Sequence, residues 1–241
     1  MKTNPLIMKI LFLHQNFPGQ YRSLAPSLAK LGHQVVAISA RKEASLMGIR
    51  NIPYHIPRAP SGEIHPWLRT TENAIFRGEA VARTLEQLIQ QGFQPDAIVG
   101  HAGWGEMQYV RQVAPQARIS SFCEYYYRGK DSDVDFDPEF PPAADAVLRC
   151  HTRNLHLTSA LVDADLGISP TQWQADQFPE FLKKRIEVCH DGIDTSLLTP
   201  SQESWIQLGR NQIKAYPGDE IVTFINRNLE PMRGYHVFMR A

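Results

Sequence analysis

Three polar and aromatic segments follow short apolar runs, at positions where side chains can take part in chemistry. Residues 14–20, His-Gln-Asn-Phe-Pro-Gly-Gln, place Gly19 at the entrance to a predicted helix, where a ligand can approach backbone N–H groups. Residues 100–106, Gly-His-Ala-Gly-Trp-Gly-Glu, combine His101 with Trp104. An imidazole can hydrogen-bond a sugar hydroxyl, and an indole offers a flat apolar face to a sugar ring. These residue types favour a ligand with hydroxyl groups.

The third segment begins with Glu124, Tyr125 and two further tyrosines, and an acidic stretch follows at 131–139. An EF-hand loop needs Gly at its sixth position and Glu at its twelfth, but counting from Asp131 those places hold Phe136 and Pro142. A metal-binding Asp-x-Asp pair stays open as an alternative. The favoured interpretation is a solvated acidic loop, and we expect no metal site.

Other functional classes lack their motifs. The chain has no G-x-G-x-x-G dinucleotide fingerprint, no G-x-S-x-G elbow and no P-loop. Its 25 basic and 25 acidic residues cancel, so no global field attracts nucleic acid. The three cysteines are far apart, which fits a reducing compartment. No apolar run is long enough to span a bilayer, so we expect a cytoplasmic protein. A local basic patch for the inner face of the plasma membrane stays open.

Short, continuously apolar runs alternate with helical patterns over most of the chain, as in parallel sheets that are covered on both faces. The expected strands span 9–14, 34–39, 52–56, 96–101, 118–123, 165–169 and 185–189. The main expected helices span 21–31, 71–91 and 143–162. This alternation predicts an α/β class domain, a doubly wound Rossmann-like parallel sheet, over residues 1–199.

The pattern changes near residue 200. Residues 200–218 are expected to form a linker with one short helix, and residues 219–241 to begin a second domain. A strand is expected at 220–226, a turn at 231–234 and a helix from Tyr235. Because the sequence stops within this helix, we expect the second domain to be truncated.

Six segments occur in an order that resembles a known family. Together they resemble the retaining glycosyltransferase family 4, group 1 enzymes of the GT-B fold, in a bacterial branch with a GHxGWGE-type loop. The segments are 16–20 (NFPGQ), 101–106 (HAGWGE), 136–141 (FDPEFP), 169–173 (SPTQW), 190–194 (HDGID) and 227–234 (RNLEPMRG).

The resemblance implies two Rossmann-like domains, of which this chain carries the N-terminal, acceptor-side one. It implies a nucleotide-sugar donor as co-substrate, a saccharide or lipid-linked acceptor and no further cofactor. His101 matches the active-site histidine that contacts the transferred sugar, and Gly19, Arg227 and Arg233 match positions near the donor phosphates. The residues expected on the acceptor and sugar side are Trp104, Glu106, Glu124, Tyr125 and Asp194.

The chemistry that the resemblance implies needs positive charge at the departing phosphate. Two arginines and a helix N-terminus can stabilise this charge without a metal. Asp191 and Asn226 depart from the family pattern, where Asn and a small residue are usual. The family's E-x7-E pair is expected beyond Ala241, so we expect the chain to be inactive alone. A non-catalytic module that binds a sugar or a partner stays open as the alternative.

Overall fold

The computed structural model of the chain describes residues 6–42, 46, 48–56, 62–210 and 213–241. Two units are distinguished within it. The first consists of Met1–Val134 and Pro142–Asp191, and the second of Asp135–Pro141 and Gly192–Ala241.

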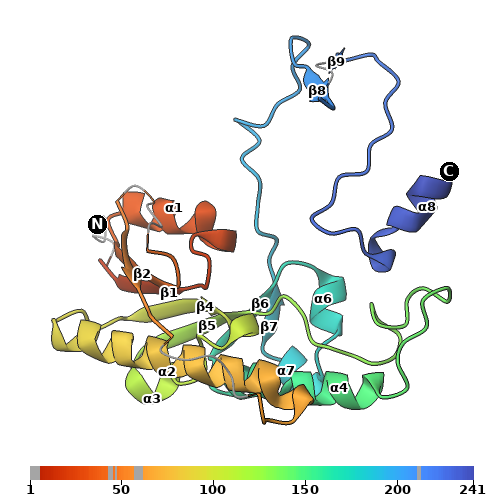
Figure 1. Cartoon of the computed structure of the whole chain (residues 1–241). Helices are drawn as coiled ribbons and strands as arrows, with labels where there is room; N and C mark the ends of the chain where they lie inside the picture. Colours follow the sequence, from red (N-terminus) through yellow and green to blue (C-terminus); the bar gives the residue numbers. More distant parts are fainter. Residues whose placement is uncertain (1–5, 43–45, 47, 57–61, 211–212) are drawn as a thin grey trace. The chain divides into compact units, whose positions relative to one another are not determined.

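The first unit is built on a seven-stranded sheet in which all neighbouring strands run parallel (Figure 1). The strand order is β3-β2-β1-β4-β5-β6-β7. Each strand lies within or beside a segment expected from the sequence, so the Rossmann-like α/β class is confirmed. The strands are β1 (Lys9–Leu13), β2 (Gln34–Ser39), β3 (Arg50–Pro53), β4 (Ala97–His101), β5 (Arg118–Phe122), β6 (Leu166–Ser169) and β7 (Ile186–Val188).

The order of the strands reverses beside β1. Leu11 of β1 is aligned with Val36 of β2 on one side and with Ile98 of β4 on the other. Connections leave a parallel sheet in opposite directions at such a reversal, so a crevice forms beyond the carboxyl ends of the central strands. The segments after β1, β4 and β5 therefore meet at one edge of the sheet.

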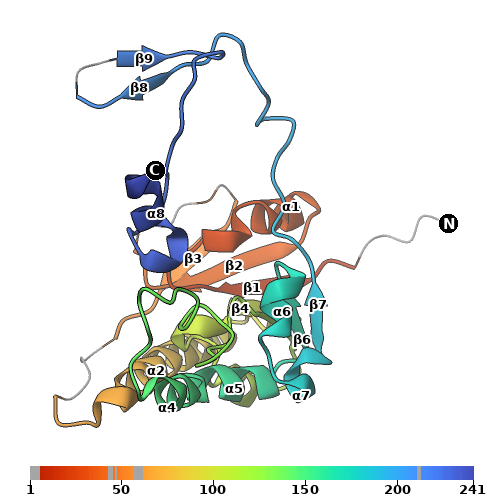
Figure 2. The same cartoon turned by 90° about the vertical axis from the view of Figure 1, so that its right-hand side faces the viewer.

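Alternate residues of β1 enter two separate apolar cores. Leu11 and Leu13 belong to the larger core, together with residues of α2 and α5, whereas Ile10 and Phe12 pack with Tyr21 in the smaller one. Figures 1 and 2 show α1 on one face of the sheet and α2, α4 and α5 on the other. The period of two along a strand produces this division.

The helices of the first unit vary widely in length. They are α1 (Leu24–Lys30), α2 (Arg69–Gln90), α3 (Val110–Val113), α4 (Ala146–Arg153), α5 (Leu155–Val162), α6 (Gln172–Asp176) and α7 (Glu180–Lys183), with 3₁₀ helices at Gly19–Arg22, Pro66–Leu68 and Ala102–Trp104. Gly32 and Gly92 follow α1 and α2 at φ +92° and +93°, as expected of glycines that end helices.

The expected helix over 143–162 is wrong, because the structure contains two helices, α4 and α5, with Asn154 between them. The Asn154 side chain accepts a hydrogen bond from the N–H of Tyr127 (2.9 Å) and donates one to its carbonyl (2.7 Å). Asn and Asp side chains often compete in this way with regular helical bonding. The break thus fixes the segment that follows β5.

The second unit also departs from the expectation. In place of a short helix, the linker region contains an antiparallel hairpin of β8 (Ile206–Leu208) and β9 (Ile213–Ala215). The strand expected at 220–226 is not formed: these residues follow an irregular path, and no strand among the described residues pairs with them. A strand needs a hydrogen-bonded neighbour, which explains the difference. The expected turn and helix are present as a 3₁₀ helix (Pro231–Arg233) and α8 (Tyr235–Arg240).

One glycine allows the loop after β4 to pack closely on α2. Gly105 has φ +111°, and a Cβ there would overlap the backbone of Ala74, whose carbonyl carbon would lie only 2.6 Å away. A Cβ added at Gly78, one turn further along α2, would lie 2.9 Å from the Gly105 carbonyl oxygen. Backbone therefore packs on backbone where the loop crosses the helix.

We expect Gly105→Ala to destabilise the fold by more than the roughly 1–2 kcal/mol that a left-handed backbone conformation costs alone. Gly92→Ala is the matched control, because Gly92 has φ +93° with nothing within 4 Å of the new Cβ. Urea unfolding gives both free energies. Equal losses for the two variants would contradict the close approach of Gly105 to α2.

Candidate active site at the carboxyl ends of β1, β4 and β5

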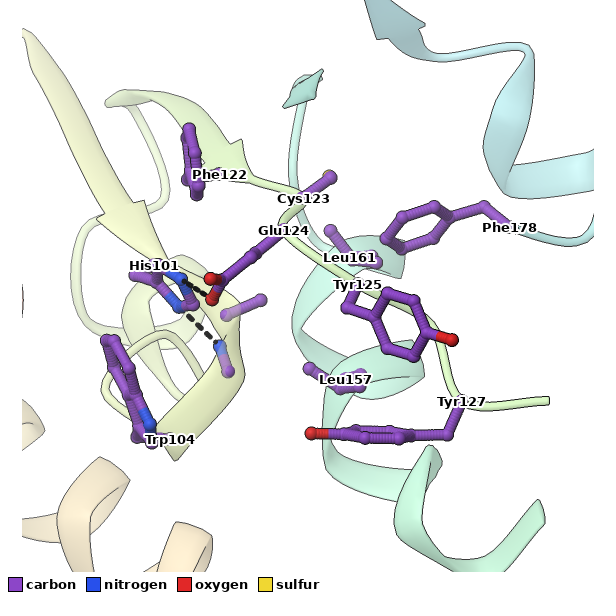
Figure 3. A pocket seen from close by; sticks show the side chains of 12 residues that line it. His101, Trp104, Phe122, Cys123, Glu124, Tyr125, Tyr127, Leu157, Leu161 and Phe178 are labelled. Carbon is purple, nitrogen blue, oxygen red and sulfur yellow. Dashed lines mark hydrogen bonds and ion pairs between the residues drawn. The ribbon is translucent and has the colours of Figure 1, made fainter. Parts of the chain in front are cut away.

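His101, the last residue of β4, is bonded through both ring nitrogens. Its side chain is 3% exposed, and its Nδ1 accepts a hydrogen bond from the Gly103 N–H at 2.9 Å. The proton of the neutral ring therefore lies on Nε2, 3.0 Å from Oε2 of Glu124. The Glu124 side chain is 51% exposed, so this pair connects a buried ring to a carboxylate that a ligand can reach (Figure 3).

A second histidine supports the turn that carries His101. Nε2 of His156, on α5, lies 3.2 Å from the carbonyl oxygen of Gly103, whose N–H bonds to His101. Gln108 holds the backbone of His156 in turn, with its side-chain amide donating to the His156 carbonyl (2.5 Å). Burial lowers the pKa of His156, which favours a neutral ring. This supporting role of His156 was not predicted from the sequence.

Trp104 and His14 complete an aromatic cluster around His101. The indole stacks on the imidazole with ring centroids 4.1 Å apart and an interplanar angle of 20°. His14, directly after β1, meets the His101 ring edge-on at 5.7 Å and Trp104 at 5.0 Å. The expected grouping of His101 and Trp104 is therefore present, with His14 as a member that the sequence analysis did not single out.

The His14 ring is fixed by its own loop. Nδ1 accepts from the Asn16 N–H (2.9 Å), and Nε2 donates to Oε1 of Gln20 (2.6 Å). Burial, and then the charge of nearby His101, lowers the pKa of His14 from 6.5 to about 4. The ring is therefore neutral at neutral pH.

Gly19 packs directly against this histidine. It has φ +47°, and a Cβ there would lie 2.5 Å from Nε2 of His14, so only glycine fits. Gly19 begins a four-residue 3₁₀ helix (Gly19–Arg22) rather than an α-helix. The structure thus explains the glycine by its contact with His14, and its role near a phosphate stays a prediction.

A small pocket opens beside the His101–Glu124 pair. Its aromatic side includes Tyr125 and Tyr127, as Figure 3 shows, and its floor is apolar. The Tyr125 ring stacks on Trp173 of α6 (centroids 5.9 Å apart), and its hydroxyl donates to Asp133 (2.6 Å). The lining residues are His101, Ala102, Gly103, Trp104, Phe122, Cys123, Glu124, Tyr125, Tyr127, Leu157, Leu161 and Phe178.

Glu106 does not share this pocket, contrary to its expected place on the sugar side. Its side chain is completely buried, and Oε1 accepts a hydrogen bond from the Tyr54 hydroxyl at 2.6 Å. Arg77 lies 3.8 Å from the same oxygen and donates to the Tyr54 hydroxyl (3.2 Å). Burial raises the pKa of Glu106. The residue joins the loop after β4 to the segment after β3 and α2.

Asp191, the last residue of the first unit, belongs to the electrostatic surroundings of the site. Burial raises the pKa of its carboxyl group, with a smaller rise from the nearby charge of Glu124 and an opposing effect of His101. Asp191, one of the departures from the family pattern, was not expected at the site.

The remaining expected site residues lie in the second unit. Asp194 is exposed, and its Oδ1 accepts hydrogen bonds from the Ser196 hydroxyl (2.6 Å) and the Ser196 N–H (3.0 Å). Arg233 donates to Glu230 (2.9 Å) and to Asn226 (2.7 Å). The Arg227 N–H donates to the Asn226 side chain (3.1 Å). Their expected contacts with a donor stay predictions.

The second unit also contains three side chains of metal-ligand type. Asp137, Glu139 and His236 bring one donor atom each within 4.8 Å of one another. However, Nε2 of His236 is 2.9 Å from Oδ2 of Asp137, and Arg240 contacts both oxygens of Glu139 at 2.7 and 2.5 Å. The guanidinium already neutralises one of the two carboxylates, so these residues form a salt-bridged cluster.

Comparison with known proteins identifies one family. The model of the group described as glycosyl transferase family 4 matches residues 31–198. No curated protein sequence matches the chain.

Among the described residues, no helix has the length and apolarity to cross a membrane.

Several solved structures are similar to the chain. The catalytic domain of starch synthase IV from Arabidopsis thaliana, bound to ADP and acarbose, is 15% identical over 79% of this chain and 52% of its own, at a TM-score of 0.49. The calicheamicin glycosyltransferase CalG4 is 17% identical over 77% of this chain and 53% of its own, at a TM-score of 0.43. MnaA of S. aureus in a co-structure with UDP is 17% identical over 76% of this chain and 44% of its own, at a TM-score of 0.42. The chain thus spans about half of each.

The lowered pKa of His14 makes the stability of the fold depend on pH. In the unfolded chain His14 takes up a proton near pH 6.5, and in the folded chain only at about 4. Its contribution to the free energy of unfolding is therefore complete above pH 6.5 and is lost as the pH falls to 4. The loss in the free energy of unfolding is about 3 kcal/mol. We expect His14→Gln to reduce the acid-induced loss, as measured by urea unfolding at a series of pH values. His55→Gln, at an exposed position, is the control. An unchanged pH profile in His14→Gln would contradict this assignment.

Proposed function

The chain belongs to the glycosyl transferase family 4 group, and from this we propose that it forms the acceptor-side part of a retaining glycosyltransferase that uses a nucleotide-sugar donor and needs no metal. The observation that carries the proposal is the His101–Glu124 pair beside Trp104, at the carboxyl ends of adjacent parallel strands. The expected acceptor is a saccharide or a lipid-linked saccharide.

In this proposal, His101 contacts the transferred sugar. Its Nε2–H, which now points to Glu124, is a hydrogen-bond donor for a sugar hydroxyl, and the turn at Gly103 fixes the tautomer. A donor that is positioned in advance stabilises a polar transition state without reorganisation. Trp104, Tyr125 and Tyr127 supply flat faces on which sugar rings can stack.

The departing nucleoside diphosphate gains negative charge while the sugar becomes oxocarbenium-like. We assign the stabilisation of this negative charge to Arg227 and Arg233, because a guanidinium group can donate two parallel hydrogen bonds to phosphate oxygens. Asp194 is assigned to the sugar side of the same reaction. Arg227 is exposed and Arg233 half-exposed in the second unit, so water and ligands can reach both side chains.

We expect His101→Ala, in the complete protein that carries this chain, to lower sugar transfer at least about tenfold, since it removes a contact that strengthens in the transition state. Release of nucleoside diphosphate from UDP-, GDP- and ADP-sugars measures the rate. His55→Ala is the control, because it removes an exposed histidine outside the site. Wild-type turnover in a folded His101→Ala protein would overturn the assignment. No transfer by the unaltered protein from any donor would favour a non-catalytic binding module.

Metal independence has its own test. If arginine side chains stabilise the negative charge of the leaving group, EDTA should leave the rate of sugar transfer nearly unchanged. The rate is measured in the complete protein before and after chelation. Complete loss, restored by Mg²⁺ or Mn²⁺, would contradict this and direct attention to Asp137, Glu139 and His236.

A further inference from the structure

A second, larger pocket lies between the start of α2 and the helix α4. Figures 1 and 2 show these two helices side by side on one face of the sheet. The cavity has a volume of about 540 Å³, within the usual range for small-molecule sites. It has no residue in common with the pocket beside His101.

Two arginines line this pocket from α4. Arg149 and Arg153 are one turn apart, so their side chains lie on the same face of the helix. Arg149 has one carboxylate nearby, Asp145 at 3.9 Å, in a solvent-exposed pair that contributes little. No carboxylate among the described residues lies within salt-bridge distance of Arg153, which leaves positive charge available at the pocket.

The rest of the pocket is mainly apolar. Trp67 lies at the α2 side, with Ala143 and Ala146 on the α4 side. Cys150, also in the lining, is a buried free cysteine whose pKa is raised by burial, so it adds no negative charge. An anionic group attached to a ring or other flat apolar part fits a lining of this kind.

Arg153 connects the two pockets. Its guanidinium carbon lies 3.8 Å from the centroid of the Tyr127 ring, and Tyr127 lines the pocket beside His101. Asn154, the next residue, holds the backbone of Tyr127 with two hydrogen bonds. Tyr127 therefore lines the candidate active site and at the same time contacts Arg153, which lines the charged pocket.

We propose that the pocket between α2 and α4 binds a phosphate group that is carried next to a sugar or another ring. Guanidinium groups pair with phosphate oxygens through parallel N–H bonds, and two of them on one helix face match a doubly charged group. If the proposed function holds, on which this last step rests, the compound is a phosphorylated acceptor whose phosphate binds here while its sugar lies toward His101.

The test measures binding to the 241-residue chain by calorimetry, without donor and without transfer. The probes are glucose 1-phosphate and phenyl phosphate, compared with glucose, phenol and inorganic phosphate. Phosphatidylcholine vesicles with and without a polyprenyl diphosphate that carries glucose distinguish a lipid-linked source from a soluble one. We expect at least one ring-bearing phosphate, soluble or in vesicles, to bind about tenfold more tightly than inorganic phosphate or its uncharged counterpart.

Variants connect this binding to the pocket. Arg149→Gln and Arg153→Gln should each weaken binding about tenfold, and Arg153→Lys should weaken it less because it keeps the charge but loses the paired contact. Arg118→Gln, an exposed arginine at the start of β5, changes the net charge equally and should have no effect. Melting temperatures establish that each variant is folded.

Two outcomes would overturn the proposal. The first is that none of the ring-bearing phosphates binds better than inorganic phosphate, in solution or in vesicles. The second is that binding is equal in Arg149→Gln, Arg153→Gln and Arg118→Gln, which would show a nonspecific effect of charge. Since binding is measured without transfer, either result leaves the proposed glycosyl transfer standing. An absence of transfer by the unaltered complete protein would instead contradict the proposed function and leave the phosphate pocket standing.

Discussion

The parallel direction of all seven strands is the constraint on which the candidate site depends. It brings every carboxyl end to one edge of the sheet, so residues from distant parts of the sequence meet there. His14 follows β1, His101 ends β4 and Glu124 follows β5, and these three strands are neighbours. The site therefore needs no long loop to assemble it, and the strands hold the side chains of the site more precisely than loops would.

Within that frame, a chain of hydrogen bonds determines the state of His101. Gly103, in the 3₁₀ helix that follows β4, accepts a hydrogen bond from His156 of α5 at its carbonyl oxygen. Its N–H donates to His101, which faces Glu124. The close packing of Gly105 on α2 holds the same turn from another side. A buried histidine is thereby kept in one tautomer by contacts that do not themselves reach the pocket.

The sheet could be predicted from the sequence because buried parallel strands produce continuous apolar runs, and all seven runs correspond to strands. The break at Asn154 could not, because the two hydrogen bonds that favour it join residues far apart in the sequence. At the site, His101 and Trp104 were predicted from their types and their place after a strand. Glu106 was expected beside them but faces Tyr54 and Arg77, since sequence position does not tell which way a side chain turns.

The clamp of Asn154 on Tyr127 has a mechanical consequence. Because both backbone hydrogen-bonding groups of Tyr127 are held by a residue at the junction of α4 and α5, a displacement of α4 has to move the Tyr127 backbone as well. The tyrosine ring is covered by Arg153 of α4. Backbone and ring of Tyr127 are thus both held from the region of α4 that lines the other cavity, so the two cavities share one structural support.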